Sequence, residues 1–332
     1  MTPILEWGNN LIVSIQSIGS SWVLPMTLLS FLGTEQFFIL IAPLVYWCID
    51  VNLGLRMSVY LMICAGLDEA LKVLWHAPRP YWIDSRVKAY SVETTFGIPS
   101  GHSMKSTVIW GSLAVTLRKG IGWFISLLLI FLIGFSRLYL GMHFPSDVLA
   151  GWFLGALLLI LLFWLEKPIV MWVKRKTTTN KIILAFILSV ALIFINWLSH
   201  LSLGNWQVPV IWIQNAATAT EIFEPINPLD PSNAISASGA LFGLALGYFL
   251  LETKGGFQTK GSMWDKITRF FIGLVGIILL WKGLGMLLPD ASDLASLTLR
   301  YMRYTLVGAW ITGGAPWIFL RCKLAEKTSL PH

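Results

Sequence analysis

Two histidines and an aspartate have the types and spacing needed for nucleophilic and acid–base chemistry. His102 follows a Pro-Ser-Gly sequence, and His143 lies four residues before Asp147. Asp147 is about one helical turn from His143, so its carboxylate can hold one imidazole nitrogen and leave the other free to attack. His102 then remains to protonate the leaving oxygen. These three residues are the candidate catalytic groups.

Three cations, Lys72, Arg79 and Arg137, accompany the candidate catalytic groups. Guanidinium groups present planar forks that suit phosphate oxygens. Ser100 and Gly101 stand where a helix is expected to begin, so free backbone N–H groups and the positive end of the helix dipole would add to an anion cradle. The set therefore predicts a phosphate-binding site.

Structural interpretations compete with some of these assignments. Lys72 follows Asp68 and Glu69 by about one helical turn, so a buried ion pair would also explain it. His76 matches no position of the pattern, and we expect it to be structural. Lys105 lies one turn into an apolar run and is not expected to be catalytic.

The motifs have a recognisable order. They read Lys72-x6-Arg79-Pro80, Pro99-Ser100-Gly101-His102 and Ser136-Arg137-x5-His143-x3-Asp147. Together they resemble the three signature motifs of the type 2 phosphatidic acid phosphatase (PAP2) superfamily. The resemblance implies a metal-free, cofactor-free hydrolysis in two steps, in which His143 forms a phosphohistidine, Asp147 orients it, and His102 acts as acid and then as base. The phosphoryl oxygens would be held by Lys72, Arg79, Ser100, Gly101 and Arg137.

The chain that carries the motifs is strongly apolar. Hydrophobic residues fill 56% of its 332 positions and charged residues only 12%, whereas a soluble protein carries roughly 25% charged residues. Apolar runs of spanning length occur at 34–50, 53–74, 101–117, 121–141, 146–165, 181–199, 233–251, 267–287 and 304–320. We therefore expect an all-α polytopic membrane helical bundle, with about nine transmembrane helices and a PAP2-type catalytic core.

The sequence suggests three parts. Residues 1–33 mix apolar and polar positions and predict an interfacial or re-entrant segment. Residues 34–166 hold the motifs and form the catalytic membrane core, and residues 167–332 add helices that complete the bundle. In this last part, glycines at intervals of four residues (Gly239, Gly243 and Gly247) predict close helix packing, either within the chain or in a homo-oligomer.

The basic residues predict the topology. With the N-terminus outside, most of the 24 lysines and arginines fall in loops that face inward. The net charge of +7 is then a topology signal, and we expect no nucleic-acid partner. The site would face outward, which means away from the cytoplasm in a prokaryotic plasma membrane, the location we favour, or into the lumen of an endoplasmic reticulum. The three cysteines are far apart in or beside apolar runs, so we expect no metal site.

The favoured substrate is a lipid phosphate or diphosphate that enters from the outer leaflet, because interfacial aromatics such as Trp75, Tyr81 and Trp82 adjoin the motifs. A soluble sugar phosphate is the first alternative, since the chain also resembles the nine-span glucose-6-phosphatase branch, notably at Arg79-Pro80-Tyr81-Trp82. Vanadium-dependent halide oxidation is disfavoured because those enzymes are typically soluble. A phosphate-binding transporter would not explain two histidines and Asp147.

Overall fold

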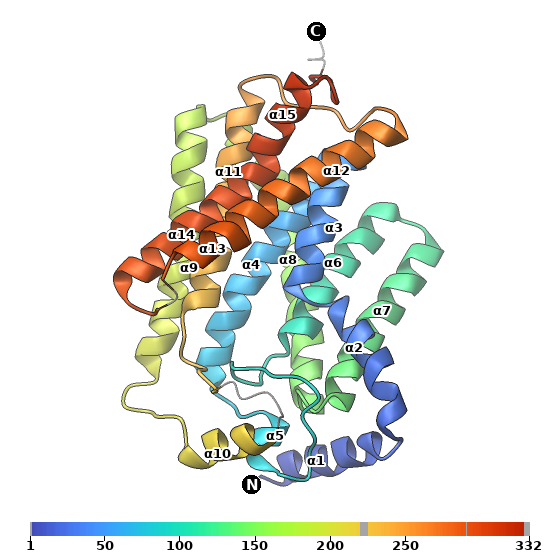
Figure 1. The fold of residues 1–332 in the computed structure, drawn as a ribbon, viewed down its shortest axis with the longest axis vertical. Helices are drawn as coiled ribbons and strands as arrows, with labels where there is room; N and C mark the ends of the chain where they lie inside the picture. Colours follow the sequence, from blue (N-terminus) through green and yellow to red (C-terminus); the bar gives the residue numbers. More distant parts are fainter. Residues whose placement is uncertain (1, 220–224, 290, 329–332) are drawn as a thin grey trace. The chain divides into compact units, whose positions relative to one another are not determined.

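The computed structural model describes residues 2–219, 225–289 and 291–328, and within these ranges the chain is helical with no strand (Figure 1). The chain divides into two compact units that alternate along the sequence. Unit 1 comprises Met1–Phe37, Leu67–Leu161 and Asn196–Asp230, and unit 2 comprises Phe38–Gly66, Leu162–Ile195 and Pro231–His332. All predicted site residues belong to unit 1.

Unit 1 contains the helices whose ends carry the motifs, together with helices that carry none. They are α1 (Pro3–Gln16), η1 (Ser20–Trp22), α2 (Val23–Phe31), α5 (Pro80–Ile83), α6 (Gly101–Leu117), α7 (Gly120–Tyr139) and α10 (Val210–Ala219). Three longer helices contribute one end each: α4 (Val51–Trp75), α8 (Pro145–Lys174) and α9 (Thr178–Ser202). Pro80 and Pro145 are the first residues of α5 and α8. An N–H at this position has no partner within the helix, so proline, which lacks one, costs no helical hydrogen bond.

Unit 2 holds the remaining helices. They are α3 (Glu35–Cys48), most of which lies in this unit, α11 (Ser232–Glu252), α12 (Met263–Ile278), η2 (Leu279–Gly283), α13 (Leu284–Leu287), α14 (Leu294–Ala309), η3 (Trp310–Gly314) and α15 (Ala315–Arg321). Local signals start two of them. Ser262 and Asp265 form a reciprocal capping box at α12, and the Asp293 carboxylate accepts backbone N–H groups at α14.

Each of the nine predicted spans coincides with helical structure, but among the described residues five helices have the length and composition of a membrane span. These are Gly120–Tyr139, Pro145–Lys174, Thr178–Ser202, Ser232–Glu252 and Met263–Leu287. A sixth is added if Pro3–Gln16 and Ser20–Phe31, which meet at 91°, form one broken span. Helix α4 is long enough, yet it carries four charged residues, and α6 has only 17 residues. The count of nine therefore stays a prediction.

The glycine stripe of α11 packs inside unit 2. A methyl group on Gly239 would lie 2.5 Å from the Tyr301 carbonyl oxygen, and one on Gly243 would collide with the Thr305 carbonyl. A methyl group on Gly247 would meet the Thr312 hydroxyl oxygen at 2.5 Å. The glycines thus allow the backbone of α11 to lie directly against α14 and η3. Of the two predicted roles for the glycines, the structure shows packing within the chain.

A buried apolar cluster in unit 1 supports the motif loops. Met142 and Phe144, the neighbours of His143, belong to it together with Trp82 and Phe96. All four side chains are at most 1% exposed. Packing on both sides of His143 therefore fixes the loop that carries it, because a close-packed interior leaves little room for displacement.

Candidate active site

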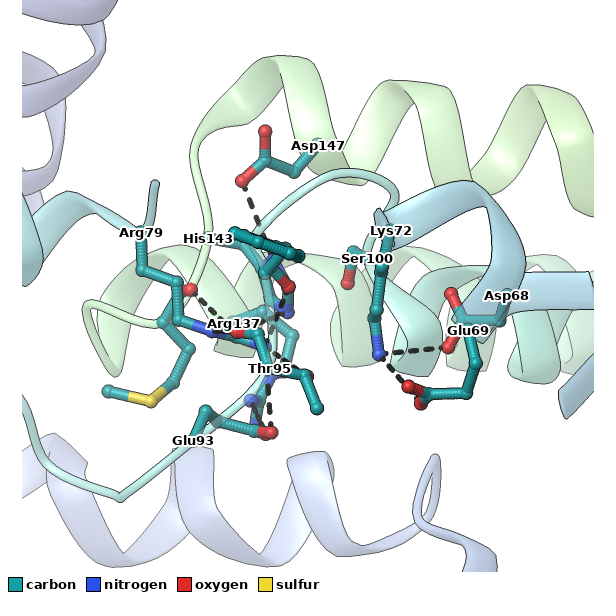
Figure 2. A network of polar contacts seen from close by, with 12 residues as sticks. Asp68, Glu69, Lys72, Arg79, Glu93, Thr95, Ser100, Arg137, His143 and Asp147 are labelled. Carbon is teal, nitrogen blue, oxygen red and sulfur yellow. Dashed lines mark hydrogen bonds and ion pairs between the residues drawn. The ribbon is translucent and has the colours of Figure 1, made fainter. Parts of the chain in front are cut away.

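The three motifs meet in unit 1, and Figure 2 shows Arg79 and Arg137 grouped with His143, while the Lys72 ammonium is directed at Asp68 and Glu69. Each motif residue comes from the end of a helix or from a loop. Lys72 lies in the last turn of α4, Arg79 caps α5, Ser100 and Gly101 begin α6, Arg137 ends α7, His143 lies in the loop before α8, and Asp147 is in the first turn of α8.

The start of α6 is tied to the start of α8. The Ser100 side chain accepts the Ser103 N–H as an N-cap, and the Ser100 N–H donates to the Asp147 carbonyl oxygen at 2.9 Å. Gly101 has to be a glycine here, because a Cβ atom would collide with the Asp68 carboxylate. The hydrogen bond between Ser100 and Asp147 thereby fixes the positions of the second and third motifs relative to each other.

His143 has one polar neighbour at each ring nitrogen, with hydrogen-bond contact at Nε2 and a longer contact, not a hydrogen bond, at Nδ1. Its Nδ1 lies 3.5 Å from Asp147 Oδ2, and its Nε2 lies 3.2 Å from Arg79 Nη1. Because a guanidinium can only donate, Nε2 must accept and therefore carries the lone pair, which places the ring proton on Nδ1 toward Asp147. Burial, with the charges of Arg79 and Arg137 acting in the same direction, holds the pKa of His143 well below its usual value, so the imidazole stays neutral.

Arg79 is fully buried and its donors are almost all engaged by the protein. It donates to the carbonyl oxygens of Thr95 (2.6 Å), Phe96 (3.0 Å) and Met142 (3.0 Å), and to the Thr95 hydroxyl at 3.1 Å. Its remaining N–H points at His143 Nε2. The guanidinium is therefore fixed in place, with one donor directed at the candidate nucleophile.

Glu93 is a member of the site that sequence reasoning missed. Arg137 Nη2 donates to Glu93 Oε1, and Glu93 Oε2 lies 3.7 Å from Arg79 Nη2. Burial raises the pKa of Glu93, but the charges of Arg79 and Arg137 outweigh it and hold the pKa well below the usual value. No motif spacing marks this residue, and the one available signal was that two buried arginines require a counter-charge.

Arg137 is buried and is held at two of its nitrogens. Besides its bond to Glu93, its Nη1 donates to the Ser30 hydroxyl at 2.7 Å. Its Nε is also buried and has no hydrogen-bond partner among the described residues. Arg137 thus keeps a donor that a bound oxyanion can use.

Lys72 shows the ion pairing that its spacing predicted. Its Nζ lies 3.0 Å from Asp68 Oδ2 and 3.4 Å from Glu69 Oε1. Lys105 joins the same network, with its Nζ 2.7 Å from Glu35 Oε1 and 3.8 Å from Asp68 Oδ2. Lys72 therefore forms a buried ion pair and also lies beside the other motif residues, so the two interpretations of it are compatible. The ion pairs of Lys105 explain its position without a catalytic role.

His102 and His76 take different places. His102 lies in the first turn of α6, and a methyl group on Gly33 would be 3.5 Å from its ring atom Cδ2. The His76 ring instead packs against Trp206, with ring centres 5.0 Å apart.

Comparison with known proteins agrees with the class that the motifs and the helices define. Residues 53–171 match the PAP2 superfamily, and residues 235–327 match the transmembrane extension of PAP2 superfamily phosphatases. The chain is a member of the PAP2 superfamily. Resemblance to the glucose-6-phosphatase branch has no counterpart in these matches.

Similar proteins include two phosphatases. Sphingosine-1-phosphate phosphatase 2 of Mus musculus is 29% identical over 138 residues, 40% of this chain and 39% of that protein. A probable sphingosine-1-phosphate phosphatase of Dictyostelium discoideum is 33% identical over 159 residues, 42% of this chain and 38% of that protein. The chain thus spans about two fifths of the length of these curated relatives.

One solved structure is also similar. It is the crystal structure of a transmembrane PAP2 type phosphatidylglycerolphosphate phosphatase from Bacillus subtilis, which is 26% identical with a TM-score of 0.43. The similarity covers 51% of this chain and 89% of that one.

Proposed function

We propose that the chain is an integral-membrane phosphatase that hydrolyses a lipid phosphate or diphosphate through a phosphohistidine on His143. The observation that carries the proposal is the orientation of His143, whose Nε2 lone pair faces Arg79 at 3.2 Å while Nδ1 faces Asp147 at 3.5 Å. This arrangement leaves the lone pair on Nε2 and the proton on Nδ1, as an attacking imidazole requires, and a phosphate carrier would not need a nucleophile.

In the first step, the Nε2 lone pair of His143 attacks phosphorus and forms a P–N bond. The bond from phosphorus to the leaving oxygen breaks, and His102 donates a proton to that oxygen. The Arg79 N–H that faces Nε2 moves to a phosphoryl oxygen, where it joins Arg137, Lys72 and the backbone N–H groups at the start of α6. The proton on Nδ1 stays beside Asp147, which stabilises the charge on the ring.

In the second step, a water molecule attacks the phosphohistidine. His102, now neutral, takes a proton from the water, and the new P–O bond forms as the P–N bond breaks. The electron pair returns to Nε2 of His143, and inorganic phosphate leaves. The cations that held the phosphoryl oxygens in the first step serve the second step without rearrangement, since the phosphorus atom moves little.

A lipid substrate is favoured over a sugar phosphate. The similar proteins from Mus musculus and Dictyostelium discoideum are named for sphingosine 1-phosphate, a phosphorylated lipid. Trp75, at the end of α4 beside the first motif, is 42% exposed, as expected of a ring at a membrane interface. We further propose that all nine predicted spans cross the membrane and that the site faces away from the cytoplasm.

The test is phosphate release by the purified, detergent-solubilised chain in EDTA, beside His143→Ala. The panel contains a sphingoid phosphate, phosphatidate, phosphatidylglycerophosphate, a polyprenyl diphosphate and glucose 6-phosphate. His332→Ala, which changes a histidine outside every motif, serves as the matched control. We expect EDTA-resistant release that only His143→Ala abolishes, with a lipid preferred. Equal release by His143→Ala would rule out this nucleophile, and a preference for glucose 6-phosphate would overturn the lipid assignment.

A further inference from the structure

A segment of the second half of the chain packs against the first motif and the loop that leads to the second motif. We call it the cap segment: residues 203–219 and 225–230, which include α10. It lies in unit 1 with the site. It falls between the two family matches, 53–171 and 235–327, and belongs to neither.

Hydrogen bonds join the cap segment to the loops that carry the site. Asn215 Nδ2 donates to the Trp82 carbonyl oxygen at 2.9 Å, and the Asn227 N–H donates to the Thr94 carbonyl oxygen at 3.2 Å. Thr94 lies between Glu93 and Thr95, two of the three residues of this loop that contact Arg79, the third being Phe96. The cap segment is therefore hydrogen-bonded to Trp82, which follows Arg79 in the chain, and to the loop whose residues contact the Arg79 guanidinium.

Trp206 is the central aromatic contact of the cap segment. Its ring centre lies 5.0 Å from that of His76 and 5.6 Å from that of Phe96, both in edge-on geometry. A second tryptophan, Trp212, lies 5.9 Å from Trp82. Trp206 thus touches a residue before Arg79 in the chain and a residue after it.

Phe96 contacts Arg79 directly, and His76 lies three residues before Arg79 within the first motif. The Phe96 carbonyl oxygen accepts an N–H from Arg79 Nη2 at 3.0 Å. The His76 N–H donates to the Lys72 carbonyl oxygen at 2.8 Å, and His76 has a φ of +34°. A non-glycine residue in this region persists only where its surroundings hold it, and the Trp206 ring is part of those surroundings.

We propose that the cap segment is a positioning element for the phosphate site, and that Trp206 acts by holding His76 and Phe96 and, through them, Arg79. This inference rests on the proposed phosphatase function for its kinetic consequence, but its effect on oxyanion binding can be measured separately. Trp206 is a positioning residue and does not enter the reaction. Its role would explain why a segment outside both family matches is packed onto the motif loops.

The first test compares Trp206→Ala and Trp206→Phe with Trp264→Ala, which changes a tryptophan that is 77% exposed. Binding of orthovanadate, a phosphate analogue, is measured by calorimetry, and kcat and KM are measured with the preferred substrate of the panel. We expect Trp206→Ala to weaken vanadate binding and lower kcat/KM by about tenfold, because small displacements of positioning groups are costly. Trp206→Phe should recover most of the loss, and Trp264→Ala should match the parent chain.

The second test combines Trp206→Ala with His76→Gly, which relieves the positive φ and removes the ring. If Trp206 acts through His76, the two changes are coupled, and the double variant should lose little more than the more affected single variant. Losses that multiply would overturn the proposal, and so would normal vanadate binding in Trp206→Ala. A parent chain that binds vanadate but releases no phosphate from the panel would instead contradict the proposed function and leave the positioning role measurable.

Discussion

Replacing Glu93 with glutamine removes the charge that links two buried arginines while keeping the shape of the side chain. Glu93 accepts a bond from Arg137 and lies 3.7 Å from Arg79 through its other oxygen. We infer that it aligns the two guanidinium groups for a phosphoryl group. Glu93→Gln should therefore lower kcat/KM and raise the inhibition constant of orthovanadate by the same factor.

The expected size of the loss in Glu93→Gln follows from the geometry of the Glu93 contacts. A hydrogen bond to a charged group contributes about 1.5–3 kcal/mol, and 25% of the Glu93 side chain is exposed, which argues against the higher values of a fully buried pair. A change of this size corresponds to a loss of about tenfold to hundredfold. Because the pKa of Glu93 lies below its usual value, the carboxylate is charged from pH 5 to pH 8, and the deficit should not vary over that range.

The assay is phosphate release with vanadate inhibition, measured at several pH values. Glu252→Gln is the matched control, because Glu252 pairs with Lys181 at 2.7 Å in unit 2. Tighter vanadate binding by Glu93→Gln would refute the reasoning, since it would mean that the carboxylate competes with the phosphoryl group for the arginines. A deficit that disappears at pH 5 would also contradict it.

Three further predictions follow from the geometry. Gly101→Ala should weaken vanadate binding and lower the melting temperature, because its methyl group would collide with the Asp68 carboxylate. The His143 imidazole should titrate below pH 6.5, because burial and the charges of Arg79 and Arg137 hold its pKa below the usual value; a ring titration at or above pH 6.5, followed by NMR and assigned by its loss in His143→Ala, would be inconsistent with this. Gly243→Ala should lower the melting temperature through a clash with the Thr305 carbonyl and leave vanadate binding by the residual folded protein unchanged.

The motif residues could be predicted from the sequence because helix geometry fixes their local relations. The four-residue spacing places His143 in the loop just before α8 and Asp147 in the first turn of α8, and the Pro-Ser-Gly sequence marks the start of α6. Ser100 meets Asp147 through a backbone hydrogen bond that no spacing reveals. The sequence therefore indicated which residues meet, while the bonds that connect them required the fold.

Glu93 and Trp206 could not be predicted because their contacts depend on loops. Glu93 lies in the irregular stretch between α5 and α6, where no period places a side chain. Trp206 lies 130 residues after His76, its ring partner. Residues at such separations meet only through the tertiary fold, so the signals that found the motifs could not extend to them.

The engagement of Arg79 by backbone carbonyl groups has a consequence for how the site treats anions. Because three carbonyl oxygens and the Thr95 hydroxyl hold the guanidinium, its rotational freedom is lost when the chain folds and not when a ligand arrives. An incoming oxyanion then meets a cation that is already held in place, and only the N–H that faces His143 has to change its partner. Lysine at this position would lack the donors to satisfy these acceptors and aim a charge at His143 at the same time.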